Sequence, residues 1–186
     1  MVLYFFQIIV ALVIGIISIP ILSTFAIIIF FEDGLPILFK QKRVGKNNEL
    51  FLIYKLRTMK KSTPDIPTHL LKDSEKMYTY FGPIIRKLSI DELPQLINII
   101  KGDINFVGPR PALHNQDDLI KLRSDKGINC LKPGITGWAQ VNGRDKLSIV
   151  EKVSFDEYYL KNKSFLLDAK ILVKTIIKVF RGSDVL

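Results

Sequence analysis

Apolar residues fill the start of the chain without interruption by charge. No side chain in residues 1–31 is charged, and the first acidic residue is Glu32. About 20 apolar residues in a helix cross the hydrocarbon core of a bilayer, so this run predicts a membrane-embedded helix over residues 1–31. Its start lacks Lys and Arg, and no small-x-small cleavage site precedes Glu32, which argues against a cleaved signal peptide. We therefore expect a retained anchor followed by one domain over residues 32–186.

One proline interrupts this apolar run near its middle. Pro20 has no N–H and leaves the carbonyl of Ile16 without its helical donor. That state is costly in hydrocarbon unless Ser18, Ser23 or Thr24 supplies a hydrogen bond. Two geometries satisfy the sequence: a kinked helix that spans the membrane, and a re-entrant hairpin that enters and leaves on one face.

Cations follow the apolar run closely under either geometry. They are Lys40, Lys42, Arg43 and Lys46. The positive-inside rule places such a cluster, and with it the rest of the chain, in the cytoplasm.

The hydrophobic pattern after the anchor changes to short elements. Two apolar runs at residues 35–39 and 50–54 flank a polar turn at 45–48 and predict a β-hairpin. The second run continues into Lys55 and Arg57, whose alternation places both cations on one face of the strand. The hairpin thus presents positive charge to whatever packs against it.

The sequence predicts both loops and helices in the later segments. The polar residues 60–75 contain two prolines and predict a mobile loop, whereas residues 114–125 predict an exposed helix. Residues 132–144, rich in Gly and polar groups around one Trp, predict a loop where main chain can approach a ligand. Residues 168–181 carry a lysine every four positions opposite an apolar side, which predicts a basic amphipathic helix. Such a helix packs on the domain, lies among anionic lipid headgroups, or does both.

Two adjacent carboxylates, Asp91 and Glu92, begin the next helix. Ser89 and Glu92 have the spacing of a capping box, and Pro94 is tolerated near a helix start. Helical spacing continues through Leu93, Leu96, Ile97 and Ile100. The pair could simply complement the helix dipole. Basic residues on both sides favour a functional site instead.

The candidate basic residues lie in two further segments. Gly108, Pro109, Arg110 and Pro111 form a stiff turn that presents a guanidinium suited to bidentate anion binding. In the loop at 132–144, the side chains of Gln140, Asn142 and Arg144 offer directional hydrogen bonds.

Charge narrows the class of partner. The 186 residues carry a formal net charge of +9, which calls for anionic lipid, a phosphorylated substrate or nucleic acid. A membrane anchor and the absence of zinc spacing, a recognition-helix pattern and ribonucleoprotein aromatics argue against nucleic acid.

The single Cys130 excludes an internal disulfide, and His69 and His114 are too isolated to build a metal site.

Several long motifs in order resemble a known family. They are LFKQKRVG, FLIYKLRTM, RKLSIDELPQLINIIKGDINFVGPRP, PGITGWAQVNGR and the spaced D…YYLKNKSFLLD from Asp156 to Asp168. The chain resembles the monotopic phosphoglycosyl transferases of the bacterial sugar transferase family, in their small single-domain form. Such enzymes start lipid-linked capsule, O-antigen or glycan assembly at the cytoplasmic face of the bacterial inner membrane.

The resemblance implies a reaction and a fold. The reaction moves a sugar-1-phosphate from a UDP-sugar, here expected to be N-acetylated, to undecaprenyl or a similar polyprenyl phosphate, with Mg²⁺ and release of UMP. The fold is helix-rich α+β: a re-entrant N-terminal membrane hairpin, and a small cytosolic domain with a short β-hairpin and amphipathic interfacial helices.

The resemblance also implies roles for residues. Asp91 is the nucleophile that forms an aspartyl-phosphosugar, and Glu92 is its neighbour at the metal. Asp91 and Glu92 are the expected metal ligands. We add Lys55, Arg86 and Arg110 as candidates that neutralise the anionic substrates, so the expected catalytic set is Asp91, Glu92, Arg86, Lys55 and Arg110. The residues expected to bind substrate are Pro109, Pro111, Gln140, Asn142, Arg144 and Asp156. Both ionised nucleophiles need no general base at neutral pH, so the main barrier is repulsion between anions. Ping-pong kinetics should follow.

Three positions depart from the family pattern. The chain begins MVLYFFQ where a Lys-Arg and an Asp are common, has Ile19 rather than Ser before Pro20, and has Asp145 where Asn is common after Arg144.

Two other functions remain open: a membrane-tethered basic binding module, and a lipid diphosphate hydrolase that uses the same acidic pair. The sugar, the glycan pathway and the oligomeric state, a homodimer included, are not fixed by the sequence.

Overall fold

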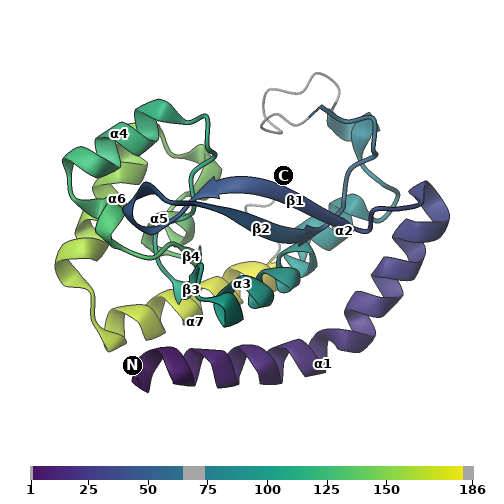
Figure 1. The fold of residues 1–186 in the computed structure, drawn as a ribbon, viewed down its shortest axis with the longest axis horizontal. Coiled ribbons are helices and arrows are strands. Elements are labelled where there is room, and N and C mark those ends of the chain that lie inside the picture. Colours follow the sequence, from purple (N-terminus) through teal and green to yellow (C-terminus); the bar gives the residue numbers. More distant parts are fainter. Residues whose placement is uncertain (1, 65–73, 182–186) are drawn as a thin grey trace.

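The computed structural model describes residues 2–64 and 74–181. Its first element, α1 (Val2–Asp33), confirms the predicted long apolar helix and contains Pro20 within its length. By length and composition, residues 4–33 are long and apolar enough to cross a membrane. Figure 1 shows that α1 runs beneath the rest of the chain, bends, and climbs one side of it.

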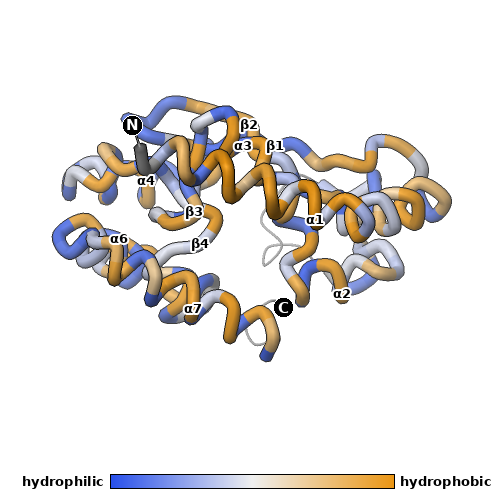
Figure 2. The backbone as a smooth tube through the Cα atoms, turned by 90° about the horizontal axis from the view of Figure 1, so that it is seen from below, coloured by the Kyte–Doolittle hydropathy of each residue, from blue (hydrophilic) through white to orange (hydrophobic). Residues whose placement is uncertain are grey.

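Both halves of α1 pack against the same body of protein. Ala11 in the first half packs with Leu96 and Ile99, and Ile29 in the second half packs with Leu56 and Ile85. The opposite side of the helix is bare, with Ile17 70% and Phe31 81% exposed. Figure 2 shows that hydrophobic residues follow one another along most of α1.

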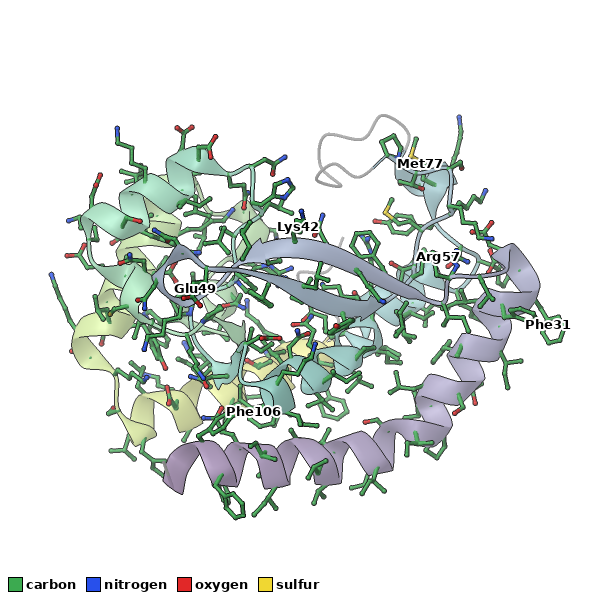
Figure 3. All side chains as sticks on the ribbon, in the orientation of Figure 1. Phe31, Lys42, Glu49, Arg57, Met77 and Phe106 are labelled. Carbon is green, nitrogen blue, oxygen red and sulfur yellow. The ribbon has the colours of Figure 1, made fainter. Side chains whose placement is uncertain are left out.

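Hydrogen bonds fix α1 near each of its ends. The amide oxygen of Gln7 accepts the backbone N–H of Phe106 at 3.1 Å, and the Tyr4 hydroxyl donates to the carbonyl of Ile100 at 3.2 Å. At the other end, Nη2 of Arg57 donates to the carbonyl of Gly34 at 2.7 Å. Figure 3 shows Phe106 above the first half of α1 and Arg57 beside its last turn.

The hydroxyls near Pro20 do not bond as the sequence suggested. Ser18 donates to the carbonyl of Ile14 at 2.7 Å, and Thr24 donates to that of Pro20 at 2.9 Å. Each hydroxyl reaches the carbonyl four residues before its own, which is the ordinary geometry for Ser and Thr in a helix. The expected repair of the Ile16 carbonyl by Ser18 or Thr24 is therefore wrong.

The predicted β-hairpin is present with a shifted first strand. Strands β1 (Leu38–Val44) and β2 (Leu50–Leu56) pair antiparallel, with Leu38 opposite Leu56 and Val44 opposite Leu50. The prediction placed the first arm at residues 35–39 because it followed apolar residues. In the structure β1 runs on through the cations, since Lys40 and Lys42 occupy the exposed positions of an alternating strand.

The remaining helices surround this hairpin and a second, smaller sheet. The helices are α2 (Gly82–Lys87), α3 (Leu96–Lys101), α4 (Asp117–Asp125), α5 (Trp138–Val141), α6 (Ile149–Asn162) and α7 (Phe165–Arg181). The strands β3 (Asn105–Val107) and β4 (Gly134–Thr136) pair in parallel. Within residues 2–64 and 74–181, 3₁₀ segments occur at Lys46–Asn48, Ser74–Met77, Ile90–Gln95, Ile128–Cys130 and Arg144–Lys146. The result is the helix-rich α+β fold that was expected.

Several segment predictions need adjustment. The expected loop at 132–144 holds β4 and α5, because its Gly134 and Thr136 pair with β3. The exposed helix at 114–125 is confirmed as α4, and the C-terminal helix is confirmed as α7, which begins three residues earlier than predicted. Most of the predicted mobile loop at 60–75, with His69, lies outside the described residues.

Candidate active site

The acidic pair lies in a 3₁₀ segment, Ile90–Gln95, which leads directly into α3. Asp91 and Glu92 fall in its first turn, as predicted, but the expected capping box is wrong. Ser89 has a left-handed φ of 54° and makes no side-chain cap, and its own N–H already donates to the carbonyl of Arg86 at 2.9 Å. The Glu92 carboxylate is directed to cations instead.

Three cations from distant segments converge on Glu92. Nζ of Lys55, in β2, lies 2.8 Å from Oε1 of Glu92 and 3.7 Å from Oδ2 of Asp91. Arg110 and Arg144 each place a guanidinium nitrogen 3.5 Å from the same Glu92 oxygen. The structure therefore brings together five of the predicted site residues. The two carboxylates are buried, with Asp91 6% and Glu92 8% exposed.

The environment treats the two carboxylates differently. Burial opposes the ionisation of Glu92, but the charges of Lys55, Arg110 and Arg144 outweigh it and hold the pKa of Glu92 far below its usual range. Burial raises the pKa of Asp91, because the attraction of Lys55 offsets it only in part and the Glu92 charge adds to it. Glu92 is thus held as an anion among the cations, and Asp91 is the more basic of the two carboxylates.

Arg86, in α2, is a further cation of the predicted catalytic set. Its Nε donates to the hydroxyl of Thr58 at 2.8 Å, and its guanidinium lies over the ring of Tyr78 at 5.0 Å. Its charge also lowers the pKa of Asp91, though less than Lys55 does. Arg57, predicted to share a face with Lys55, lies just past β2 and binds the end of α1 instead.

The turn that carries Arg110 is held by close main-chain contacts. A Cβ on Gly108 would lie 2.4 Å from the carbonyl oxygen of Lys132, so the close approach of these two segments requires glycine. The carbonyl of Pro109 accepts the N–H of Gly134 at 3.0 Å, and that of Pro111 accepts Nη1 of Arg43 at 3.1 Å. Pro109 and Pro111 thus shape the turn through their backbone.

The other predicted substrate-binding residues make internal contacts. The amide of Gln140 donates to the carbonyl of Ile135 at 3.0 Å, and that of Asn142 donates to Trp138 at 2.7 Å. Asp156 is 1% exposed and accepts hydrogen bonds from the guanidinium of Arg123. Of the residues predicted in the loop at 132–144, Arg144 is the one that the structure places against Glu92.

Two residues near the site were not predicted. Arg43 and Arg123 both donate to carbonyls of the Arg110 turn. Arg43 was noted only as a positive-inside charge, and Arg123 lies in a helix expected to be exposed. Their sequence neighbourhoods carry no signal of this role, because it depends on packing between segments far apart in the chain.

Small cavities flank the Arg110 turn. One is lined by three cations, Arg43, Lys55 and Arg110, together with Ile53, Gln95, Pro111 and Gly134. Cations that gather beside two carboxylates suit the binding of a phosphate that arrives with a divalent cation.

The acidic pair also fits the chemistry of Mg²⁺. Within residues 2–64 and 74–181 no cluster of three or more His, Cys, Asp or Glu could enclose a metal ion. Mg²⁺ does not need one, since it commonly takes one or two carboxylates and completes its shell with water and substrate phosphate oxygens. Asp91 and Glu92 offer those carboxylates.

The chain is similar in sequence to known proteins. Residues 1–182 match the family model described as bacterial sugar transferase. The chain is 46% identical over 164 residues to the uncharacterised sugar transferase EpsL of Bacillus subtilis, covering 87% of this chain and 78% of EpsL.

Two longer relatives have names that state a reaction. The UDP-N-acetylgalactosamine-undecaprenyl-phosphate N-acetylgalactosaminephosphotransferase of Aeromonas hydrophila is 38% identical over 88% of this chain. The UDP-glucose:undecaprenyl-phosphate glucose-1-phosphate transferase of Escherichia coli is 34% identical over 87% of it. The match spans only 40% and 36% of their own lengths. With a family match along nearly its whole length, the chain belongs to the bacterial sugar transferase family.

Proposed function

We propose that this protein transfers a sugar-1-phosphate from a UDP-sugar to a polyprenyl phosphate such as undecaprenyl phosphate. The carrying observation is the buried Asp91–Glu92 pair with Lys55, Arg110 and Arg144 gathered around it. The names of the relatives in Aeromonas and Escherichia describe this reaction for those proteins. An exposed apolar α1 suits a lipid-linked acceptor.

The reaction proceeds in two displacements at one phosphorus. An Asp91 oxygen attacks the phosphate nearest the sugar, a new P–O bond forms, and the bond to the second phosphate breaks to release UMP. The enzyme then holds an aspartyl-phosphosugar. A phosphate oxygen of the polyprenyl phosphate attacks the same phosphorus, and the bond to Asp91 breaks. The products are polyprenyl-diphosphate-sugar and the original carboxylate.

Positive charge is what the site must supply. Two unit charges about 4 Å apart repel by ~4 kcal/mol at an effective dielectric of ~20, so a carboxylate approaches a diphosphate only where cations offset that repulsion. Lys55 touches both carboxylates, and Arg110 and Arg144 extend the cluster from the other side. Bound Mg²⁺ would add charge on the diphosphate and stabilise the leaving UMP.

The packing of α1 supports a re-entrant, monotopic arrangement at the cytoplasmic face. A helix that spans a bilayer places its two ends on opposite sides. Here Gln7 and Arg57 tie both ends to one body of protein. The bare faces of α1 and α7 would then lie in the lipid, with Lys170, Lys174 and Lys178 among anionic headgroups of the inner leaflet.

The test is UMP release in nanodiscs that contain Mg²⁺ and undecaprenyl phosphate, across a panel of UDP-sugars. N-acetylated hexosamines are the expected donors, and UDP-galactose and UDP-glucose complete the panel. Intact-protein mass spectrometry without acceptor should show a sugar-phosphate adduct. Asp91→Asn should abolish both signals, because an amide does not displace UMP, while Asp118→Asn, on exposed α4, should leave both unchanged.

Each alternative predicts a distinct result. A lipid diphosphate hydrolase would release phosphate from polyprenyl diphosphate without any UDP-sugar. A binding module would show neither activity and would depend more on the α7 lysines than on Asp91. Normal turnover in Asp91→Asn would contradict the assignment of the nucleophile.

A further inference from the structure

The structure assigns a positioning role to Arg123 and Asp156: through the carbonyl of Arg110, they hold the turn that presents the Arg110 guanidinium to the acidic pair. This inference rests on the proposed function, because Arg110 affects turnover only if the acidic pair performs phosphoryl transfer. It gives Asp156 a part in the site without any contact to substrate.

The contact geometry carries the inference. Nε and Nη2 of Arg123 lie 3.0 and 2.6 Å from Oδ2 of Asp156, and Nη1 donates to the carbonyl of Arg110 at 2.8 Å. Every nitrogen of this guanidinium therefore has a defined partner. Only a planar, forked side chain can bind a carboxylate on one edge and a carbonyl on another. Arg123 thus links α6 rigidly to the turn.

Burial makes the link unusual for a merely stabilising ion pair. Asp156 is 1% exposed, and the Arg123 side chain is 11% exposed. Removing two such charges from water costs several kcal/mol, and apolar replacements of similar volume are often as stable. An ion pair of this kind is better explained by the geometry that it imposes. That geometry ends on the backbone of Arg110.

A second guanidinium supports the turn from the other side. Arg43, in β1, donates to the carbonyl of Pro111 at 3.1 Å. Consecutive carbonyls, of Arg110 and Pro111, are therefore each bound by an arginine. Of the three cations around Glu92, Arg110 has the most exposed side chain, at 31% against 16% for Lys55 and 19% for Arg144. An exposed, long side chain aims reproducibly only if its backbone is fixed.

The chain supplies a matched control on the same pair of helices. Glu157, next to Asp156 in α6, pairs with Lys126 beyond the end of α4 at 3.1 Å and with Lys161 at 2.6 Å. The pair with Lys126 links the same two elements near the surface, the pair with Lys161 lies within α6, and neither involves the Arg110 turn. Glu157→Gln therefore reports the general cost of loosening α4 from α6.

A double-mutant cycle tests whether Arg123 acts through Arg110. Arg123→Lys keeps the charge beside Asp156 but loses the fork, and it should slow adduct formation roughly 10- to 100-fold. Arg110→Gln alone should also slow adduct formation. Because the two residues act as one unit, the double variant should be no slower than Arg110→Gln alone. The rate of adduct formation in Glu157→Gln should stay within about threefold of the wild-type rate.

Hydrogen exchange provides a readout that needs no turnover. The N–H of Gly108 donates to Thr136 at 2.9 Å, and that of Leu113 donates to Oε1 of Gln116 at 2.9 Å. Exchange in the peptide that spans 108–113 should accelerate in Arg123→Lys and in Asp156→Asn, and not in Glu157→Gln. Unchanged exchange, or losses that multiply in the double variant, would overturn the inference. A wild-type protein without turnover would sink the proposed function, while exchange would still decide the positioning role.

Discussion

At the scale of single residues, Lys55 is the side chain on which the acidic pair depends most directly. Its Nζ lies 2.8 Å from Oε1 of Glu92 and 3.7 Å from Oδ2 of Asp91. It also lowers the pKa of both groups more than any other charge does. Its position in β2 makes the hairpin part of the active site rather than only a scaffold.

Replacing Lys55 with Gln should slow UMP release by roughly 10²–10³-fold, the range for removing one preorganised charge from a buried site. Asp91 must then approach a diphosphate with one counter-charge fewer. The measurement is the single-turnover rate of adduct formation. Lys101→Gln is the matched control, because Lys101 is an exposed cation bonded to the hydroxyl of neighbouring Tyr54. A loss below about threefold in Lys55→Gln would contradict this role.

At the scale of elements, local patterns anticipated those parts of the fold that local patterns determine. The apolar run predicted α1, and the polar turn at residues 45–48 predicted the hairpin. In the structure, Asn47 and Asn48 of that turn both have positive φ. The acidic pair, Lys55, Arg110 and Arg144 were likewise expected in one site, and the structure places them together.

Elements that depend on distant partners were missed for a physical reason. β3 and β4 have three residues each, so they are too short to show a period of two in the sequence. Their pairing also joins segments that lie about thirty residues apart in the chain. The capping box failed because Ser89 turns left-handed and Glu92 meets Lys55, neither of which the Ser-x-x-Glu spacing reveals. Arg123 looked like a surface charge because nothing local shows that Asp156 lies opposite it.

The lysines of α7 should matter for the lipid acceptor and not for the donor. Lys170 and Lys174 lie over the ring of Trp138, and Phe165 and Phe180 are 78% and 86% exposed. A cation near an anionic surface contributes ~1 kcal/mol, so replacing all three α7 lysines with Gln removes ~3 kcal/mol of attraction. We expect a higher KM for undecaprenyl phosphate in anionic nanodiscs and an unchanged rate of adduct formation.

The matched control for this helix keeps its charge. Replacing the same three lysines with Arg should preserve the KM in anionic nanodiscs, and neutral nanodiscs should remove the difference between the variants. A Gln variant that loses adduct formation and transfer equally would show that the lysines serve the fold rather than the membrane surface.

At the scale of the whole molecule, the proposed re-entrant topology is based on the packing of both halves of α1 against the rest of the protein. Ala11 and Ile29 are both fully covered, on either side of Pro20, by residues of one body of protein. A straight helix of 32 residues would extend about 48 Å, whereas α1 bends as it passes from the first contact to the second (Figure 1). Pro20 removes one helical hydrogen bond within α1, and we propose that it permits a bend that would keep both ends of the helix on one side of a bilayer.

Labelling in membrane vesicles tests this arrangement. In a Cys130→Ser background, a cysteine in a tag ahead of Val2 and one at Lys42→Cys should both react with an impermeant maleimide from the cytoplasmic side. Pro20→Leu restores the missing N–H and favours a straight helix, so the tag should become reactive from the opposite side while Lys42→Cys does not change. Gln7→Leu is a useful companion, because it removes the bond to Phe106 but leaves the bend, and its tag should remain cytoplasmic. Opposite-side labelling of the tag in the parent protein would establish a spanning helix and would contradict the re-entrant arrangement.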